Sequence, residues 1–308
     1  MKKLLLSLVL LGVLAAAVLW SKSNSISTLQ TKPGKSIDKD AYSRIISSGP
    51  VASDADIMAN EWASSVKESG VLRVGGTMTS QLFSLMDEKD GKVRGFDAGL
   101  FQLLARYIFG DETKCEITQV DAGSRESVLE NGEVDIVCAT YSITDSRKQI
   151  VDFAGPYYAS KQAILVTAGN DTIHGVDDLA GKTVATQSGS TGPEILAKYA
   201  PEASVLEYGT DAEARLALEQ GLVDAYVTDY TLLLNAMVQS PHLYQIAGEQ
   251  FGSEDDYGIG LPKDSTGTAF VNSFLKTIEE DGVWEELWHV CIGDRTEITE
   301  IPTGVRPH

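Results

Sequence analysis

The chain has 308 residues, with 25 Lys and Arg against 44 Asp and Glu, and a formal net charge of −19. That length allows one large domain or two ordinary ones, and a hydrophobic fraction of 43% is enough for a core, which excludes global disorder. The acidic balance excludes a nucleic-acid binder, because such proteins present a basic face. Only 3 Cys, without a Cys-x-x-Cys pair, exclude a zinc ribbon and a disulfide scaffold.

Residues 1–20 have the pattern of an export signal. Two lysines precede a largely apolar run over residues 4–20, which is the order found in secretory signals. An Ala-x-Ala sequence at residues 15–17 offers a cleavage site, but the apolar run continues beyond it and approaches the length that spans a bilayer. The segment is therefore either a cleaved signal peptide or a retained membrane anchor, and in both cases the rest of the chain works outside the cytoplasm.

Residues 21–65 are predicted to be a linker or extension. They are rich in Ser, Lys and Asp and contain Pro33-Gly34 and Gly49-Pro50, a composition typical of a tether. A short helix near residues 54–66 is expected to dock on the folded body.

From about Gly70 onward, strands alternate with helices. Such alternation favours parallel sheets covered on both faces, and two successive units predict two α/β lobes with a ligand cleft between them. We expect strands at residues 71–75, 115–120, 134–139, 163–166, 182–185, 223–227 and 257–262, and a hairpin at 87–92. We expect one helix from the cap Asp97 to Gly110 and another after the cap Thr144. Further helices are expected over 124–131, 211–220, 231–238 and 266–289, the last with a break at Asp281-Gly282.

A run of polar residues, 140–147, follows the third strand. It supplies hydroxyl groups, backbone N–H groups at a helix start, and Arg147 in the first turn. Because the positive end of the helix dipole disfavours a cation, an arginine there is expected to face an anion. Its guanidinium and the N–H groups at the helix start together form a binding site for a carboxylate. The alternative is that Arg147 is a solvated surface charge.

Three further features follow strand ends, where ligands of open α/β sheets bind. Arg125 lies in a first helical turn and suits a second anionic group; the alternative is a surface ion pair with Glu126 or Glu130. The loop 188–193 offers hydroxyl and N–H groups, but it lacks the lysine of a P-loop, which argues against nucleotide binding. Asp229 suits an ammonium group, although an Asp in this setting is more often a helix cap.

Sequence patterns of catalysis are missing. The chain has no G-x-S-x-G, no H-E-x-x-H and no Cys and His pair of recognisable spacing. Cys115 and Cys138 fall in predicted core strands, where a free thiol behaves as a small hydrophobic group. We therefore expect no catalytic residue, no metal site and no cofactor.

Taken together, several segments resemble a known family, the amino-acid-specific solute-binding proteins of ABC transporters (family 3, with the type II periplasmic-binding-protein fold). The resemblance covers about residues 70–290 and is closest to the actinobacterial glutamate-binding branch and the related extracellular sensor of acidic amino acids. It rests on GKVRGFD (91–97), NGEVDIV (131–137), ATYSITDSR (139–147), VDFAGPYY (151–158), DDLAGK (177–182) and YGIGLPK (257–263).

The resemblance implies an α/β protein of two lobes, with a hinge between two mixed, mostly parallel sheets. Lobe 1 would comprise residues 66–165 and 253–308, and lobe 2 residues 166–252. Such a receptor binds and releases its ligand without chemistry. The implied function is capture of glutamate or aspartate for an ABC importer.

The resemblance also implies roles for single residues. Ser190 would be part of the anion-binding loop, and Phe83 would form an apolar wall of the site. Arg147 would hold the α-carboxylate with Ser142 and Thr191, Asp229 and the carbonyl of Thr140 would hold the α-ammonium, and Arg125 would hold the side-chain carboxylate.

Three alternatives stay open. The aromatic pair that sandwiches the ligand in glutamine-type members falls at Ser80 and Ala122, yet glutamine or asparagine remains an alternative ligand. The same fold also serves as the sensing subunit of a membrane signalling partner instead of an ABC permease. A remote alternative is an enzyme of the cyclohexadienyl dehydratase type, which needs a general acid in the cleft. We expect no nucleic-acid partner, and contact with the membrane through residues 1–20 if they are uncleaved.

Overall fold

The computed structural model describes residues 36–296, 298 and 301. The predicted signal peptide or anchor at residues 1–20 lies outside the described residues, as does the first part of the predicted linker. Within the described part, no helix combines the length and the hydrophobicity needed to cross a membrane.

The C-terminal part of the predicted tether is helical. The abundance of Ser and Asp predicts a tether, but three polar residues of this segment act as helix caps and accept hydrogen bonds from backbone N–H groups of the first turn. The apolar side chains between the caps pack into the main hydrophobic core. The helices are α2 (Lys39–Ser48), α3 (Asp54–Met58) and α4 (Glu61–Ser69), and their caps are Asp38, Ser53 and Asn60.

The first half of the folded chain follows the expected alternation of strands and helices. Strand β1 pairs in parallel with β5 and with β6, while β2, β3 and β4 form a small antiparallel sheet. Helix α5 ends at Gly110, which has the left-handed conformation (φ 72°) that glycine adopts without strain. The elements are β1 (Leu72–Gly76), β2 (Thr79–Ser80), β3 (Ser84–Met86), β4 (Val93–Arg94), α5 (Phe96–Phe109), β5 (Cys115–Gln119), α6 (Arg125–Glu130), β6 (Ile136–Val137) and the 3-10 turn η1 (Arg147–Gln149).

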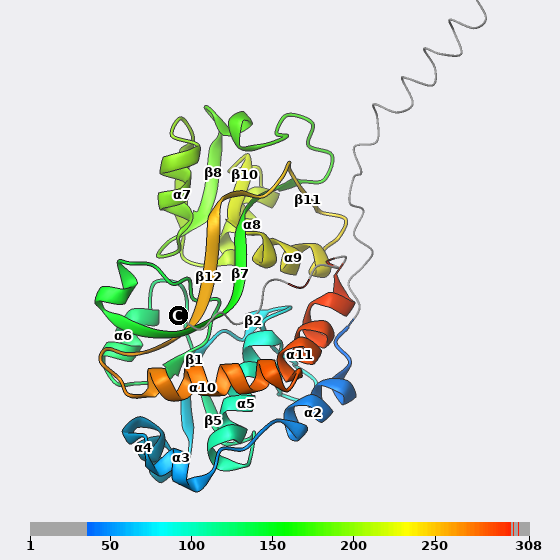
Figure 1. The fold of residues 1–308 in the computed structure, drawn as a ribbon. Coiled ribbons are helices and arrows are strands. Elements are labelled where there is room, and N and C mark those ends of the chain that lie inside the picture. Colours follow the sequence, from blue (N-terminus) through cyan, green and yellow to red (C-terminus); the bar gives the residue numbers. More distant parts are fainter. Residues whose placement is uncertain (1–35, 297, 299–300, 302–308) are drawn as a thin grey trace, which may run out of the picture. The chain divides into compact units, whose positions relative to one another are not determined.

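Two long strands connect the halves of the molecule. Strands β7 (Val151–Thr167) and β12 (Phe251–Pro262) run antiparallel to each other, and Figure 1 shows them extending from the elements around β1 to those around β8 and β10. β6 pairs with β12 and β10 pairs with β7. The two expected sheets are therefore joined, among the described residues, into one mixed sheet in the order β5-β1-β6-β12-β7-β10-β8-β9.

The second half repeats the α/β pattern. Strand β8 pairs in parallel with both β9 and β10, and the expected break at Asp281-Gly282 separates the last two long helices. The elements are η2 (Val176–Leu179), β8 (Thr183–Gln187), α7 (Gly192–Tyr199), β9 (Ser204–Tyr208), α8 (Asp211–Glu219), β10 (Ala225–Asp229), α9 (Tyr230–Gln239), β11 (Tyr244–Ile246), α10 (Gly267–Glu280), α11 (Val283–Cys291) and η3 (Gly293–Arg295).

Separate hydrophobic clusters form in the two halves. One large cluster holds Phe96 and Trp288 with the N-terminal helices, whereas Tyr226 and Leu233 belong to a different cluster built from β8, β10, α8 and α9. The expected α/β class is confirmed. The exact division into residues 66–165 with 253–308 and 166–252 stays a prediction.

Candidate functional site

Four buried or part-buried charged residues gather where the strands of both halves end. Arg125 follows β5, Arg147 follows β6 in η1, Asp229 is the last residue of β10, and Asp255 lies within β12. We call these four residues the charged cluster. Because the carboxyl ends of parallel strands meet at one edge of a sheet, residues far apart in the sequence meet here.

Arg147 is 8% exposed, so the alternative of a solvated surface charge is wrong. Its guanidinium donates from Nη1 to the carbonyl of Ser142 and from Nη2 to the carbonyl of Gly189, both at 2.8 Å. Its Nε lies 3.2 Å from a carboxylate oxygen of Glu126. Arg147 therefore bridges segments that follow β6 and β8, which places its charge between the two halves of the chain.

The helix expected after Thr144 is a single 3-10 turn, η1, so no helix dipole of useful size supports Arg147. The backbone N–H of Arg147 does donate to the Thr144 hydroxyl at 3.2 Å. The N-cap of η1 is nevertheless Ser146, so the expected cap at Thr144 is wrong, and a three-residue turn has too few aligned peptides to build a macrodipole. Any attraction for an anion at this point comes from the guanidinium.

Arg125 is 4% exposed and lies inside the molecule instead of in a surface ion pair. Its Nη1 donates to the carbonyls of Ala139 at 3.1 Å and Thr140 at 3.3 Å, while its Nε is buried without a hydrogen-bond partner. Burial, and then the charge of Arg147, lower the pKa of Arg125 to about 10, so it remains a cation at neutral pH. A buried N–H without an acceptor is unfavourable, which points to a ligand oxygen.

Both guanidiniums pack on one aromatic ring, that of Tyr141. The guanidinium carbon of Arg125 lies 4.4 Å from the ring centroid and that of Arg147 lies 5.1 Å from it. The face of an aromatic ring attracts cations, so Tyr141 helps to hold two like charges close together. Nothing in the local sequence predicts this role, although Tyr141 stands between Thr140 and Ser142 in the polar segment that follows the third predicted strand.

Asp229 occupies the N-cap position of α9, but its side chain makes no capping bond. Its carboxylate instead accepts hydrogen bonds from the side-chain amide of Gln162 and from the hydroxyl of Tyr257, the latter at 2.5 Å. Burial, and then the charge of Asp255, raise the pKa of Asp229 to about 7. The carboxylate is therefore aimed into the cluster and held there by two side chains that sequence reasoning missed.

Thr140 has a left-handed backbone conformation, with φ of 43°, which is unusual for a threonine. Its N–H donates to Asp97 at 2.8 Å, and Asp97 also accepts a hydrogen bond from the hydroxyl of Tyr157 at 2.8 Å. Asp97 was predicted to cap α5; that is wrong, because Gly95 is the N-cap and the Asp97 side chain turns inward. Asp97 thus fixes the strained turn whose carbonyl accepts from Arg125.

The hydroxyl residues differ in where they point. Thr191 donates to a carboxylate oxygen of Asp255 at 2.9 Å, and the side chain of Ser142 acts on the same carboxylate by lowering its pKa. Ser190 donates to the carbonyl of Gln187 at 2.6 Å and accepts from the N–H of Gly192 at 3.1 Å, so it stabilises its own loop. The structure brings Ser142 and Thr191 to the charged cluster, whereas the Ser190 hydroxyl is engaged within its loop.

Phe83 is fully buried and does not line the cavity at the cluster. Its ring packs against those of Tyr158 and Tyr257, with centroid distances of 5.5 and 6.3 Å. It supports Tyr257 from behind, and Tyr257 in turn donates to Asp229.

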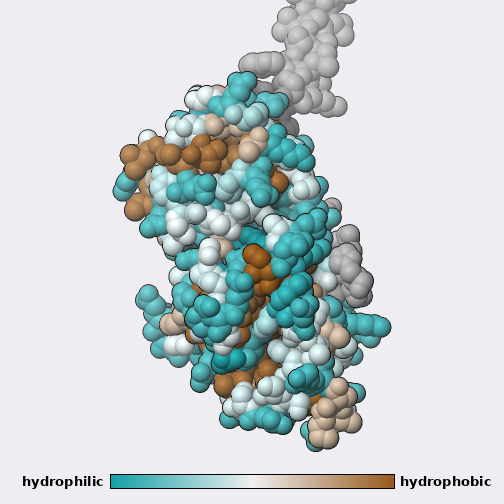
Figure 2. Space-filling model, turned by 90° about the vertical axis from the view of Figure 1, so that its left-hand side faces the viewer, coloured by the Kyte–Doolittle hydropathy of each residue, from teal (hydrophilic) through white to brown (hydrophobic). Residues whose placement is uncertain are grey.

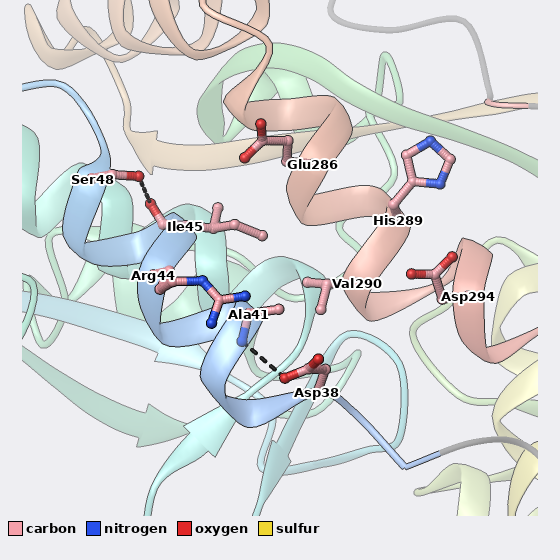
Figure 3. A pocket seen from close by; sticks show the side chains of 9 residues that line it. All are labelled: Asp38, Ala41, Arg44, Ile45, Ser48, Glu286, His289, Val290 and Asp294. Carbon is pink, nitrogen blue, oxygen red and sulfur yellow. Dashed lines mark hydrogen bonds between the residues drawn. The ribbon is translucent and has the colours of Figure 1, made fainter.

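A cavity of about 310 Å³ opens beside the cluster. The residues that line it come from three segments, which follow β5, β6 and β8. They are Ala122, Gly123, Glu126, Thr144, Ser146, Arg147, Ile150, Gly189, Ser190, Thr191 and Glu194. A second cavity of about 370 Å³ lies between α2 and α11 (Figure 3) and contains none of the predicted site residues. Among the described residues, no group of three or more His, Cys, Asp and Glu side chains is arranged to hold a metal.

The stability of the protein is expected to fall as the pH rises from about 4 to 7. Burial raises the pKa of Asp97 to about 7, so the folded protein keeps a proton that the unfolded chain loses above pH ~4. The stabilisation is complete below the unfolded pKa and is lost as the pH approaches the folded pKa. In Asp97→Asn, the pH profile of the unfolding free energy should be flatter by up to about 1.4 kcal/mol per pH unit.

Urea unfolding at half-unit pH intervals measures this effect. Asp145→Asn is the matched control, because the Asp145 side chain is 100% exposed, and its profile should be parallel to that of the original protein. Parallel profiles for Asp97→Asn as well would show that Asp97 is ionised in the folded state and would contradict the prediction.

Comparison with known proteins identifies the family of the chain. Residues 72–289 match the model of the bacterial extracellular solute-binding proteins, family 3. A glutamine-binding protein of Geobacillus stearothermophilus is 41% identical over 201 residues, covering 65% of this chain and 76% of that protein. A glutamate-binding protein of Corynebacterium glutamicum is 32% identical over 244 residues, covering 76% of this chain and 82% of that protein.

A solved structure shares the fold over most of the chain. The cysteine-binding protein of Campylobacter jejuni has a TM-score of 0.73 and 25% sequence identity, covering 81% of this chain and 100% of that one. Members of the family act outside the cytoplasm and bind solutes without catalysis. The chain belongs to the bacterial extracellular solute-binding proteins of family 3 and is an amino-acid-binding protein of the ABC-transporter type, with the type II periplasmic-binding-protein fold.

Proposed function

We propose that the protein captures an acidic amino acid, glutamate or aspartate, for an ABC importer. The observation that carries this proposal is the buried Nε of Arg125, which has no hydrogen-bond partner and lies in the same cluster as Arg147. Two guanidiniums suit a ligand with two carboxylates, and Asp229 suits its ammonium group. The relative from Corynebacterium glutamicum binds glutamate by its name, which supports the same ligand class.

In this proposal, Arg147, Ser142 and Thr191 receive the α-carboxylate, and Arg125 receives the side-chain carboxylate. Asp229 accepts from the ammonium. Residues 66–165 with 253–308 and residues 166–252 act as two lobes that close on the ligand. Closure excludes water, which strengthens each charged contact because the local dielectric constant falls.

The net charge of −19 opposes the approach of an anionic ligand at long range. Hydrophilic residues cover most of the face seen in Figure 2, so these charges are exposed to salt. At physiological ionic strength, charges more than ~8 Å from the ligand are largely screened by salt. The local potential of the two arginines therefore dominates at the site.

Glutamine is the second candidate ligand. It is favoured by the 41% identity to a glutamine-binding protein and by the two acidic residues of the cluster, which balance the two arginines and suit a ligand without net charge. In this case, the Nε of Arg125 would donate to the amide oxygen of the side chain.

Calorimetric titration of ligand-stripped protein with glutamate, aspartate, glutamine and asparagine separates the two candidates. Much tighter binding of an acid than of its amide is expected, because a carboxylate forms a stronger bond to a guanidinium than an amide does. Equal or tighter binding of the amides would overturn the acidic ligand and favour glutamine. If none of the four ligands binds, both candidate ligands are contradicted.

Arg125→Gln is expected to reduce the preference for glutamate over glutamine by at least about tenfold, because a charged hydrogen bond of ~1.5–3 kcal/mol becomes a neutral one. Competition titrations of the two ligands measure the ratio. Arg73→Gln removes the same charge at a half-exposed ion pair with Asp135, distant from the cluster in the fold, and should leave the ratio unchanged. An unchanged ratio in Arg125→Gln would show that Arg125 does not contact the ligand side chain.

A further inference from the structure

A carboxylate of the chain itself lies between the two hydroxyl groups that the proposed function assigns to the ligand. Asp255, on β12, accepts a hydrogen bond from Thr191 at 2.9 Å, and the side chain of Ser142, a second donor, lowers its pKa. These donors come from segments that follow β8 and β6, so Asp255 joins the two halves of the chain at the site.

The charged surroundings of Asp255 are those that an incoming carboxylate would meet. Arg147 and Arg125 attract it, and Asp229 lies close enough for Asp255 to raise its pKa. Burial raises the pKa of Asp255, while its hydroxyl donors and the two arginines act in the opposite direction. The hydroxyl donor that the proposed function assigns to the α-carboxylate, Thr191, is therefore in use in this structure.

We propose that Asp255 is an internal substitute for the α-carboxylate of the ligand, which must displace it on binding. The inference rests on the proposed function and deepens it. Displacement exchanges one set of charge-assisted hydrogen bonds for another, so Asp255 lowers the affinity for every ligand that carries an α-carboxylate. The negative charge of Asp255 also lies near Asp229, which favours ligands that bring an ammonium group and disfavours dicarboxylates without one.

Asp255→Asn tests the proposal. The variant keeps an oxygen that Thr191 can use, but the acceptor is neutral and is displaced more easily. Calorimetry should show about tenfold tighter binding of glutamate or glutamine, whichever binds the original protein. Glutarate, which has two carboxylates and no ammonium, should gain at least as much.

Glu254→Gln is the matched control, since it removes the same charge from the neighbouring, exposed residue of β12, and its affinities should stay within about twofold. Weaker binding of the amino acid to Asp255→Asn, with no change for glutarate, would show that Asp255 accepts from the ligand ammonium and would overturn the proposal. Unchanged affinity for the amino acid would overturn it as well.

A second measurement needs no ligand. In ligand-free protein, a carboxyl-carbon NMR titration should show a higher pKa for Asp255 in Thr191→Val than in the original protein, because a donor to the ionised form is lost. An unchanged pKa of Asp255 in Thr191→Val would show that Asp255 does not accept a hydrogen bond from the Thr191 hydroxyl. If the original protein binds none of these ligands, the proposed function fails, and this titration still decides whether Asp255 holds the position.

Discussion

Replacing Arg147 with alanine is expected to weaken amino-acid binding by ~30-fold to several-thousand-fold. Truncating one partner of a buried charged pair costs about 2–5 kcal/mol, because the ligand carboxylate is left desolvated without its counter-charge. The change also removes the bridge from Ser142 to Gly189 and leaves Glu126 without its cation. Calorimetric titration with the tightest-binding amino acid measures the loss.

Two variants show whether the guanidinium geometry is responsible. Arg147→Lys keeps the charge but cannot bond both carbonyls and Glu126 at once, so an intermediate loss is expected. Lys148→Ala removes a neighbouring cation whose side chain is 52% exposed, and binding should be unchanged. If Arg147→Ala binds within threefold of the original protein, the α-carboxylate is held elsewhere.

Replacing Asp229 with asparagine is expected to weaken glutamate or glutamine by ~30- to 150-fold, equivalent to about 2–3 kcal/mol. The carboxylate is held by Gln162 and Tyr257 and is the proposed acceptor for the ammonium. An asparagine at this position has a neutral carbonyl oxygen, and its NH2 group cannot accept a hydrogen bond from the ammonium. Competition titrations against the original protein measure the change.

Glutarate is the discriminating ligand for Asp229, because it lacks the ammonium. Its affinity should not fall in Asp229→Asn, since the loss of a nearby negative charge favours an anion. A parallel loss for glutarate and the amino acid would instead indicate that the substitution disrupts the site as a whole. Equal affinity of both proteins for the amino acid would remove Asp229 from the ligand contacts.

The electrostatics of the cluster explain why these effects should be large. Arg125 and Arg147 both pack against the ring of Tyr141, and the charge of Arg147 adds to the effect of burial in lowering the pKa of Arg125. Buried like charges are unfavourable unless oppositely charged groups lie beside them. Glu126, Asp229 and Asp255 supply those groups in this structure, so in our proposal a ligand carboxylate replaces that of Asp255 beside the arginines.

Local sequence patterns predicted the position of most of the elements and several of the site residues. Arg125, Arg147, Thr191 and Asp229 were found because each lies in a polar segment that follows a predicted strand, and strand ends of an α/β sheet converge whatever the details of packing. The helix stop at Gly110 and the break at Asp281-Gly282 were equally local, because they depend on a backbone conformation that glycine adopts easily.

The tertiary structure decided which partners these residues have. Asp97 looked like a helix cap, but burial beside Tyr157 turned its carboxylate toward the backbone of Thr140. Gln162 and Asp255 lie in the middle of long strands and carry no local signal. They reach the site because β7 and β12 pair antiparallel across both halves of the chain, a contact set by hydrogen bonding between distant segments. The sequence by itself therefore determined the fold class and the presence of an amino-acid site, whereas the arrangement of its charges depends on a pairing that no local pattern records.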